Sequence, residues 1–150
     1  MIAIIDYDAG NLTSVKRAVS HLGIECMITK EKAEIEAAER IIFPGVGAAG
    51  AAMQSLQRYG LDRAIKAALL AGKPVLGICI GSQIILAHSE ENDTPCLGIL
   101  DGTVRSFSPD KRSEYGQKLK IPHMGWNGLD VKQRHPLLFG VSASDEFYFV

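Results

Sequence analysis

The chain has 150 residues, 47% of them hydrophobic and 22% charged, which is the composition of a globular protein with enough apolar material for a core. Its 16 basic and 17 acidic residues leave a formal net charge of −1, so a nucleic-acid surface is not expected, because such surfaces neutralise phosphates with a basic excess. No apolar run reaches the roughly 18 residues of a membrane span. The length predicts a single domain, residues 1–150.

The cysteines point to a reducing compartment. The chain has three of them, Cys26, Cys79 and Cys96, an odd number at wide spacing that suits neither a disulfide framework nor a zinc cluster. The first residues carry no basic leader followed by an apolar stretch. The sequence therefore predicts a cytoplasmic protein without a bound metal.

In the first 90 residues, short apolar runs alternate with amphipathic segments. Strands are expected at 2–5, 24–29, 41–43 and 75–78, and helices at 12–22, partly within 30–40, and at 49–58, 61–71 and 82–89. This alternation predicts an α/β fold, a mainly parallel sheet with helices on both faces. Shorter strands at 102–107, 118–121 and 146–150 indicate an antiparallel or mixed extension of the same sheet.

The fourth predicted strand runs into Gly77-Ile-Cys79-Ile-Gly81, and a helix follows at once. This is the layout of a nucleophile elbow, in which a sharp turn exposes the central residue and side chains at the flanking positions would collide with backbone. The sulfur would lie at the carboxyl edge of the sheet and at a helix N-terminus, which favours the thiolate. The alternative is a structural cysteine in a tight turn.

A second loop, Pro44-Gly45-Val46-Gly47, follows the third predicted strand and so lies at the same edge of the sheet. Its backbone N–H groups, together with that of Ile80, would stabilise a tetrahedral oxyanion. The loop also matches the GxGxxG fingerprint of dinucleotide sites. That interpretation is disfavoured, because the motif follows the third strand and begins with a proline.

These residues carry a family resemblance. Gly-Ile-Cys-Ile-Gly-Ser-Gln at 77–83 resembles the signature of the class I (triad-type) glutamine amidotransferases, although Ser82 stands where the family more often has Met. The stretches Asp-Tyr-Asp-Ala-Gly-Asn at 6–11, Pro-Gly-Val-Gly at 44–47 and Pro-His-Met-Gly-Trp-Asn at 122–127 resemble, within that family, the glutaminase subunits of imidazole glycerol phosphate synthases. The resemblance implies a flavodoxin-like α/β fold.

The resemblance also implies a reaction. Cys79 would attack the side-chain amide of glutamine, giving a thioester and ammonia, and water would release glutamate. Val46, Gly47 and Ile80 would form the oxyanion hole, without any cofactor. The positions that would hold glutamine are Gly45, Gln83 and Glu91. Glu91 lies in an acidic run that could equally be a solvated face.

The partner implied by the resemblance is a (β/α)8-barrel cyclase subunit that receives the ammonia, as a heterodimer working in histidine biosynthesis. Asn11, His123 and Trp126 are the expected interface residues. Aromatic anchors dominate many interfaces, but Trp126 could equally be a half-buried core residue.

A nucleophile of this kind needs a histidine base oriented by a carboxylate. The four histidines are His21, His88, His123 and His135, and none of them matches the family's His-Pro-Glu segment. We therefore expect the chain to correspond to the N-terminal three-quarters of such a subunit and, as a 150-residue chain, not to turn over. The alternatives are a truncated, inactive homologue that acts only as a binding module, or another Cys-elbow α/β hydrolase such as a peptidase.

Overall fold

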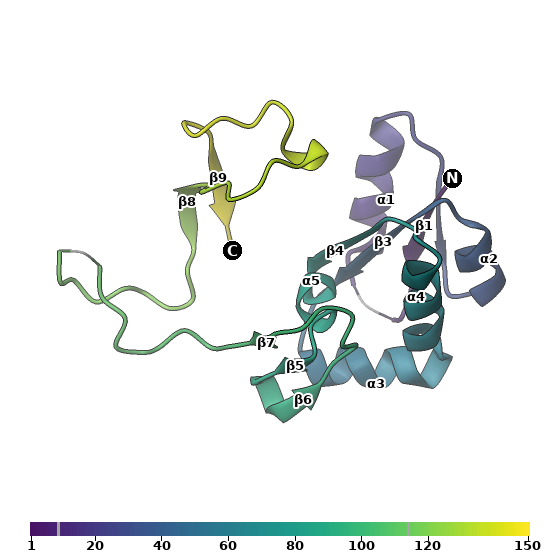
Figure 1. Ribbon diagram of the computed structural model, residues 1–150, viewed down its shortest axis with the longest axis horizontal. Helices are drawn as coiled ribbons and strands as arrows, with labels where there is room; N and C mark the ends of the chain where they lie inside the picture. The colour runs from purple at the N-terminus through teal and green to yellow at the C-terminus, as the bar shows by residue number, and fades with distance from the viewer. Residues whose placement is uncertain (9, 114) are drawn as a thin grey trace. The chain divides into compact units, whose positions relative to one another are not determined.

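The computed structural model describes residues 1–8, 10–113 and 115–150 (Figure 1). The chain forms two compact units, residues 1–106 and 107–150, and each is described by itself. The expectation of one domain over residues 1–150 stays a prediction.

The first unit is built on a four-stranded parallel sheet with the strand order β2-β1-β3-β4. The strands are β1 (Ile2–Ile5), β2 (Cys26–Thr29), β3 (Arg40–Gly45) and β4 (Val75–Cys79). Apolar residues dominate the two central strands, β1 and β3, as expected for strands that are covered on both faces. The predicted parallel α/β sheet is confirmed.

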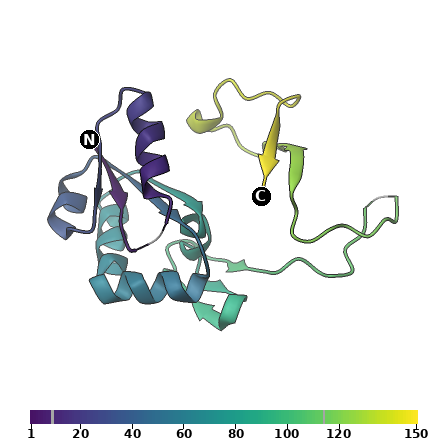
Figure 2. The ribbon, with the colours of Figure 1, turned by 180° about the vertical axis from the view of Figure 1, so that it is seen from behind.

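Helices cover both faces of this sheet, as the sequence predicts. They are α1 (Leu12–His21), α2 (Lys32–Ala37), α3 (Ala49–Tyr59), α4 (Leu61–Leu70) and α5 (Ile80–Ile84). Helix α1 lies on one side of the sheet and α3 and α4 on the other (Figure 2). Successive side chains of β3 point to opposite faces: Ile42 packs with Val19 of α1, whereas Ile41 and Phe43 join the larger core with α3 and α4. Within the described residues, no helix is long and apolar enough to cross a membrane.

The remainder of the first unit differs from the prediction. The expected helix 82–89 is wrong beyond Ile84, because the N–H of Leu86 already donates to the Gln83 carbonyl and that of Ala87 donates to Gly102 in another segment. A small three-stranded sheet, β6-β5-β7, follows instead. Its elements are β5 (His88–Ser89), the 3₁₀ helix η1 (Glu91–Asp93), β6 (Thr94–Pro95) and β7 (Thr103–Val104).

The expected extension of the main sheet is therefore also wrong for this region, since β7 covers only two residues of the expected strand 102–107 and pairs with β5. Two-residue strands carry no periodicity that a sequence could reveal.

The second unit contains an antiparallel pair, β8 (Gly125–Gly128) with β9 (Glu146–Phe149), and a 3₁₀ helix, η2 (Pro136–Leu138). The strand expected at 146–150 is confirmed to within a residue, whereas the one at 118–121 is wrong. That segment has only an isolated bridge between Arg112 and Lys118, and Pro122 directly after it has no N–H for a ladder. Sequence reasoning missed β8, which begins and ends with glycine, a residue that weakens a strand signal.

Candidate active site

Cys79 is the last residue of β4 and the residue before α5, with φ 53° and ψ −118°. A positive φ at a non-glycine residue stores about 1–3 kcal/mol of strain. The turn is closed by the Ser82 hydroxyl, which donates to the Cys79 carbonyl over 2.7 Å. The thiol is free and exposed. The strand–turn–helix geometry of a nucleophile elbow is therefore present at the predicted position.

The two glycines that flank the elbow allow it to pack. A Cβ at Gly77 would lie 2.8 Å from the Gly81 carbonyl and 2.8 Å from the Ser82 nitrogen, and a Cβ at Gly81 would lie 1.8 Å from the Phe43 carbonyl. Side chains at these positions would push α5 away from β4 and β3. The sharpness of the turn at Cys79 depends on both glycines.

The loop Gly45–Ala48 begins directly beside the nucleophile, because Gly45 is the register partner of Cys79 in the β3–β4 pair. Gly45 is buried, and a Cβ there would lie 2.1 Å from the Tyr7 hydroxyl. By contrast, Val46 is 49% exposed and Gly47 has φ +89° with open space around its Cα. The loop is thus tightly packed at its start and open at its middle.

Tyr7, two residues after the end of β1, lies beneath this loop. Its side chain is 2% exposed and its ring stands 5.3 Å from that of Phe43. Among the described residues, its hydroxyl is the one buried side-chain polar atom without a hydrogen-bond partner. Burial, and to a lesser extent the charge of a Cys79 thiolate, raises the pKa of Tyr7 to about 12. Tyr7 therefore keeps its proton at neutral pH and cannot act as a base for Cys79.

Sequence reasoning did not single Tyr7 out, because an aromatic residue after a strand is typical of an ordinary core position. Only its position under Gly45 distinguishes it.

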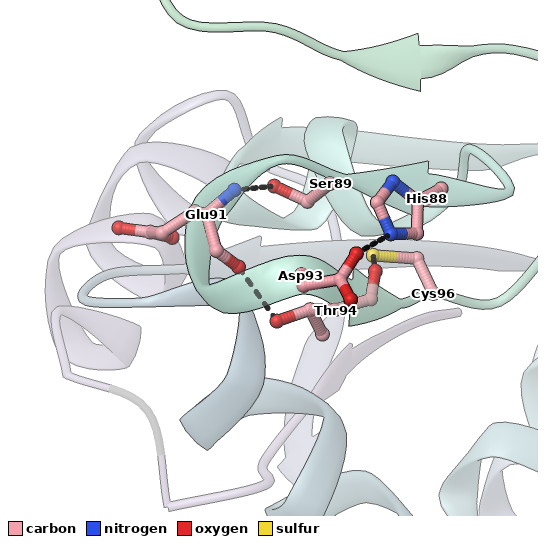
Figure 3. Close-up of polar contacts among 6 residues, drawn as sticks. All are labelled: His88, Ser89, Glu91, Asp93, Thr94 and Cys96. Atoms are coloured by element: carbon pink, nitrogen blue, oxygen red, sulfur yellow. Dashed lines mark hydrogen bonds and ion pairs between the residues drawn. The ribbon is translucent and has the colours of Figure 1, made fainter.

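Glu91 reaches the far end of the same loop. Its Oε2 accepts a hydrogen bond of 2.7 Å from the backbone N–H of Ala49, the first residue of α3. Its own N–H donates to the Ser89 hydroxyl over 3.2 Å, and the Thr94 hydroxyl donates to its carbonyl over 2.7 Å (Figure 3). Glu91 is exposed, but its carboxylate accepts a hydrogen bond at the end of the loop that begins beside Cys79. It is therefore more than a solvent-exposed member of an acidic run.

The other expected site residues lie as follows. Gln83 is half-buried on α5, the same short helix as Ile80, which is 5% exposed. Asn11 is exposed with φ +70° and comes directly before α1. Its neighbour Gly10 lies against Val46, since a Cβ there would be 3.3 Å from that side chain. The structure thus brings together the loops after β1 and β3 and the turn at Cys79 between β4 and α5.

His123 and Trp126 belong to the second unit. Trp126 is 66% exposed and meets Tyr148 edge-on with 5.6 Å between ring centroids. His123 is exposed, with its ring 5.8 Å from that of Phe149. Both side chains are thus exposed within this unit, and their place at an interface stays a prediction.

The histidines of the first unit are engaged elsewhere or exposed. His88 Nε2 lies 2.9 Å from Asp93 Oδ1 (Figure 3), and His21 is exposed in the last turn of α1. Within the described part of this unit, neither hydrogen-bonds the Cys79 thiol. In the second unit, His135 accepts the Leu137 N–H at the start of η2.

Comparison with known proteins identifies the class. The sequence model of the family "Glutamine amidotransferase class-I" matches residues 3–147. Among solved structures, "Crystal structure of glutamine amidotransferase" aligns with a TM-score of 0.60 at 22% identity, over 69% of this chain and 55% of that one. A putative peptidase E protein from Listeria monocytogenes EGD-e aligns with a TM-score of 0.51 at 20% identity, over 58% and 50%. At these identities, both structures support the fold alone.

Named relatives indicate which group within this family the chain belongs to. The chain is 53% identical over 150 residues to imidazole glycerol phosphate synthase subunit HisH of Nitratidesulfovibrio vulgaris, covering 100% of this chain and 71% of the relative. It is 48% identical to the subunit of the same name from Maridesulfovibrio salexigens, with the same coverage of both chains. The chain belongs to the class-I glutamine amidotransferase family of enzymes, and within it to the HisH family.

Proposed function

We propose that this chain acts as the glutaminase subunit of an imidazole glycerol phosphate synthase in histidine biosynthesis. The observation that carries the proposal is the strained Cys79 elbow with the Gly45–Ala48 loop in register beside it. The 53% identity to a HisH subunit supports this particular synthase. We further propose that residues 1–150 belong to one amidotransferase domain, and the family match over 3–147 supports this.

In the proposed reaction, the Cys79 sulfur attacks the side-chain amide carbon of glutamine. The N–H groups of Ile80 and of the Val46–Gly47 region hold the oxyanion that forms, ammonia leaves with an added proton, and a γ-glutamyl thioester remains. Water then cleaves the thioester, which releases glutamate and restores the thiol. The exposed Val46 and the left-handed Gly47 leave the loop peptide free to turn its N–H toward the oxyanion.

Glutamine would lie along the edge formed by the loops after β3 and β4. Gly45 would provide backbone beside the reacting amide, Gln83 a side-chain amide from α5, and Glu91 a carboxylate for the substrate's ammonium group. No cofactor is part of this proposal.

The proposed partner is a (β/α)8-barrel cyclase that takes up the ammonia, and the proposed location is the cytoplasm. Asn11 lies on a loop beside Val46, next to the proposed oxyanion site. His123 and Trp126 are exposed on the second unit, and an aromatic anchor such as Trp126 suits an interface.

We propose that residues 1–150 alone do not turn glutamine over, because neither His21 nor His88 hydrogen-bonds Cys79, whereas thioester formation and hydrolysis both need a proton acceptor. The thiol is exposed and should remain open to alkylation.

Glutamate release, measured with and without the cyclase subunit and its nucleotide ligand, tests both proposals. Labelling with 6-diazo-5-oxo-L-norleucine, followed by mass spectrometry, checks the site separately, with Cys79→Ala as the control. We expect labelling of Cys79 without turnover. Turnover at ordinary enzymatic rates would contradict the proposal that residues 1–150 lack a base for Cys79. Alkylation of Cys79 by iodoacetamide but not by the glutamine-like reagent would favour another Cys-elbow hydrolase.

A further inference from the structure

We infer that Glu91 is a positioning residue that links recognition of the substrate's ammonium group to the geometry of the oxyanion loop. One oxygen of its carboxylate holds the start of α3, directly after the loop Gly45–Ala48, and the other is available to the substrate. The inference rests on the proposed function and adds to it a mechanical role for a residue proposed there only as a ligand.

Glu91 is itself held in place by its neighbours. Its backbone is hydrogen-bonded on both sides, to Ser89 and to Thr94, and these residues are 0% and 7% exposed. The Thr94 hydroxyl also packs against α3, since a Cβ at Gly50 would lie 3.4 Å from it. The carboxylate therefore projects toward α3 from a rigid base.

The Glu91 carboxylate holds the first N–H group of α3. The Ala49 N–H is one of the donors at the start of α3 that have no partner within the helix, and it lies 2.7 Å from Glu91 Oε2. Ala49 is fully buried. A hydrogen bond to an ionised carboxylate at a helix N-terminus is stronger than a neutral one. Glu91 thus determines where the loop ends and the helix begins.

The loop between β3 and α3 is held at both ends and is open in its middle. Gly45 is held at one end by its pairing with Cys79 and by Tyr7, and Ala49 is held at the other end by Glu91. Between them, Val46 and Gly47 are both exposed, with Gly10 beside the Val46 side chain and open space around Gly47. While both ends stay in place, only the peptides of Val46 and Gly47 can turn. If the hydrogen bond between Glu91 and Ala49 changes, the end of the loop at Ala49 shifts, and the orientation of these central peptides changes with it.

The Glu91 carboxylate is shared between the start of α3 and the substrate. Within the described residues, Oε2 has the Ala49 hydrogen bond and Oε1 has none. An ammonium group bound at Oε1 draws negative charge from Oε2, so the Ala49 hydrogen bond weakens and the neighbouring Gly47 amide shifts. Binding of glutamine is thereby felt at the residues proposed to hold the oxyanion.

The test is an NMR titration of the ¹⁵N-labelled chain, following the amides of Gly47, Ala49 and Gln83. The ligands are L-glutamine and glutaramate, which is the same molecule without the ammonium group. We expect glutamine to shift the Ala49 and Gly47 amides and glutaramate to leave them in place. Glu91→Gln can still accept the Ala49 N–H but lacks the charge, so it should weaken glutamine binding about 10- to 100-fold and lower Ala49 amide-exchange protection by less than Glu91→Ala does.

Glu91→Ala removes both contacts and should lower Ala49 protection about tenfold or more. The matched control is Glu90→Gln, because this neighbouring carboxylate accepts from Ser106 instead of α3; it should change neither quantity. Glutamine-dependent shifts at Gln83 without any at Ala49 or Gly47 would overturn the inference alone, as would unchanged protection in Glu91→Ala. Absence of any glutamine-dependent shift, together with no labelling of Cys79 by the diazo reagent, would remove the proposed function as well.

Discussion

Replacing Tyr7 with Phe removes a buried hydroxyl that has no hydrogen-bond partner among the described residues. An unsatisfied buried polar group costs about 1–3 kcal/mol, whereas an apolar replacement of the same shape is neutral or stabilising. Part of that gain is offset by the contacts that the hydroxyl makes with Gly45. We therefore expect Tyr7→Phe to raise the free energy of unfolding by about 1 kcal/mol at pH 7.

The same substitution removes a pH dependence. The pKa of Tyr7 rises from 10.0 to about 12 on folding, so the folded state binds the proton more tightly. Stability from this group is fully present below pH 10 and is lost as the pH rises from about 10 to about 12. At 1.36 kcal/mol per pKa unit, the loss approaches about 2–3 kcal/mol in the native protein. Tyr7→Phe has no phenol at this position, so its stability does not fall for this reason.

Urea unfolding between pH 7 and 11.5, followed by circular dichroism at 222 nm, measures the difference, since the five α-helices of the described residues lie within residues 1–106. The stability advantage of Tyr7→Phe should grow above pH 10. Tyr115→Phe is the matched control, because Tyr115 is 88% exposed and its replacement should change little at any pH. A variant less stable than the native chain at pH 7, or an advantage that stays constant from pH 8 to 11.5, would refute the reasoning.

Three further predictions concern the elbow and the N-terminus. Gly81→Ala places a Cβ 1.8 Å from the Phe43 carbonyl, so it should destabilise the chain by about 3 kcal/mol or more, seen as a lower unfolding midpoint. Cys79→Gly relieves the positive φ of 53° and should stabilise by about 1 kcal/mol, unlike Cys79→Ala, which keeps the strain. The Met1 ammonium, at 2.7 Å, lowers the pKa of Glu39; N-terminal acetylation should raise that pKa toward its ordinary value in an NMR titration.

Each of these has a clear contrary result. A Gly81→Ala chain with an unchanged unfolding midpoint would show that α5 can move away from β3 without cost. Equal stabilities of the glycine and alanine variants at position 79 would show that the elbow stores no strain. An unchanged Glu39 pKa after acetylation would mean that the Met1 ammonium does not lower the pKa of this carboxylate.

The sequence was informative wherever the structure depends on neighbours along the chain. The elbow could be recognised because Gly77 and Gly81 are needed at fixed offsets from Cys79, for local steric reasons. The elements up to residue 84 could be placed to within one or two residues at most ends, because their apolar faces repeat at helix or strand spacing. Family resemblance added the reaction and the proposed partner.

The elements beyond Ile84 escaped prediction for a related reason. The segment 85–89 keeps an apolar, helix-like start, but its backbone is drawn into pairing with Gly102 and Val104. The helix propensity of this segment thus competes with backbone hydrogen bonds to residues far along the chain. A short window of sequence does not reveal the outcome of this competition.

The chain by itself thus determined the class of fold, the nucleophile and the turn that exposes it. Only the tertiary structure decided that Tyr7 lies beneath Gly45 and that Glu91 holds Ala49, residues 42 apart in the sequence. The physical reason is that such contacts depend on strand order, register and the path of the loops at the carboxyl edge of the sheet. These are properties of the packed molecule, and no local pattern of residues encodes them.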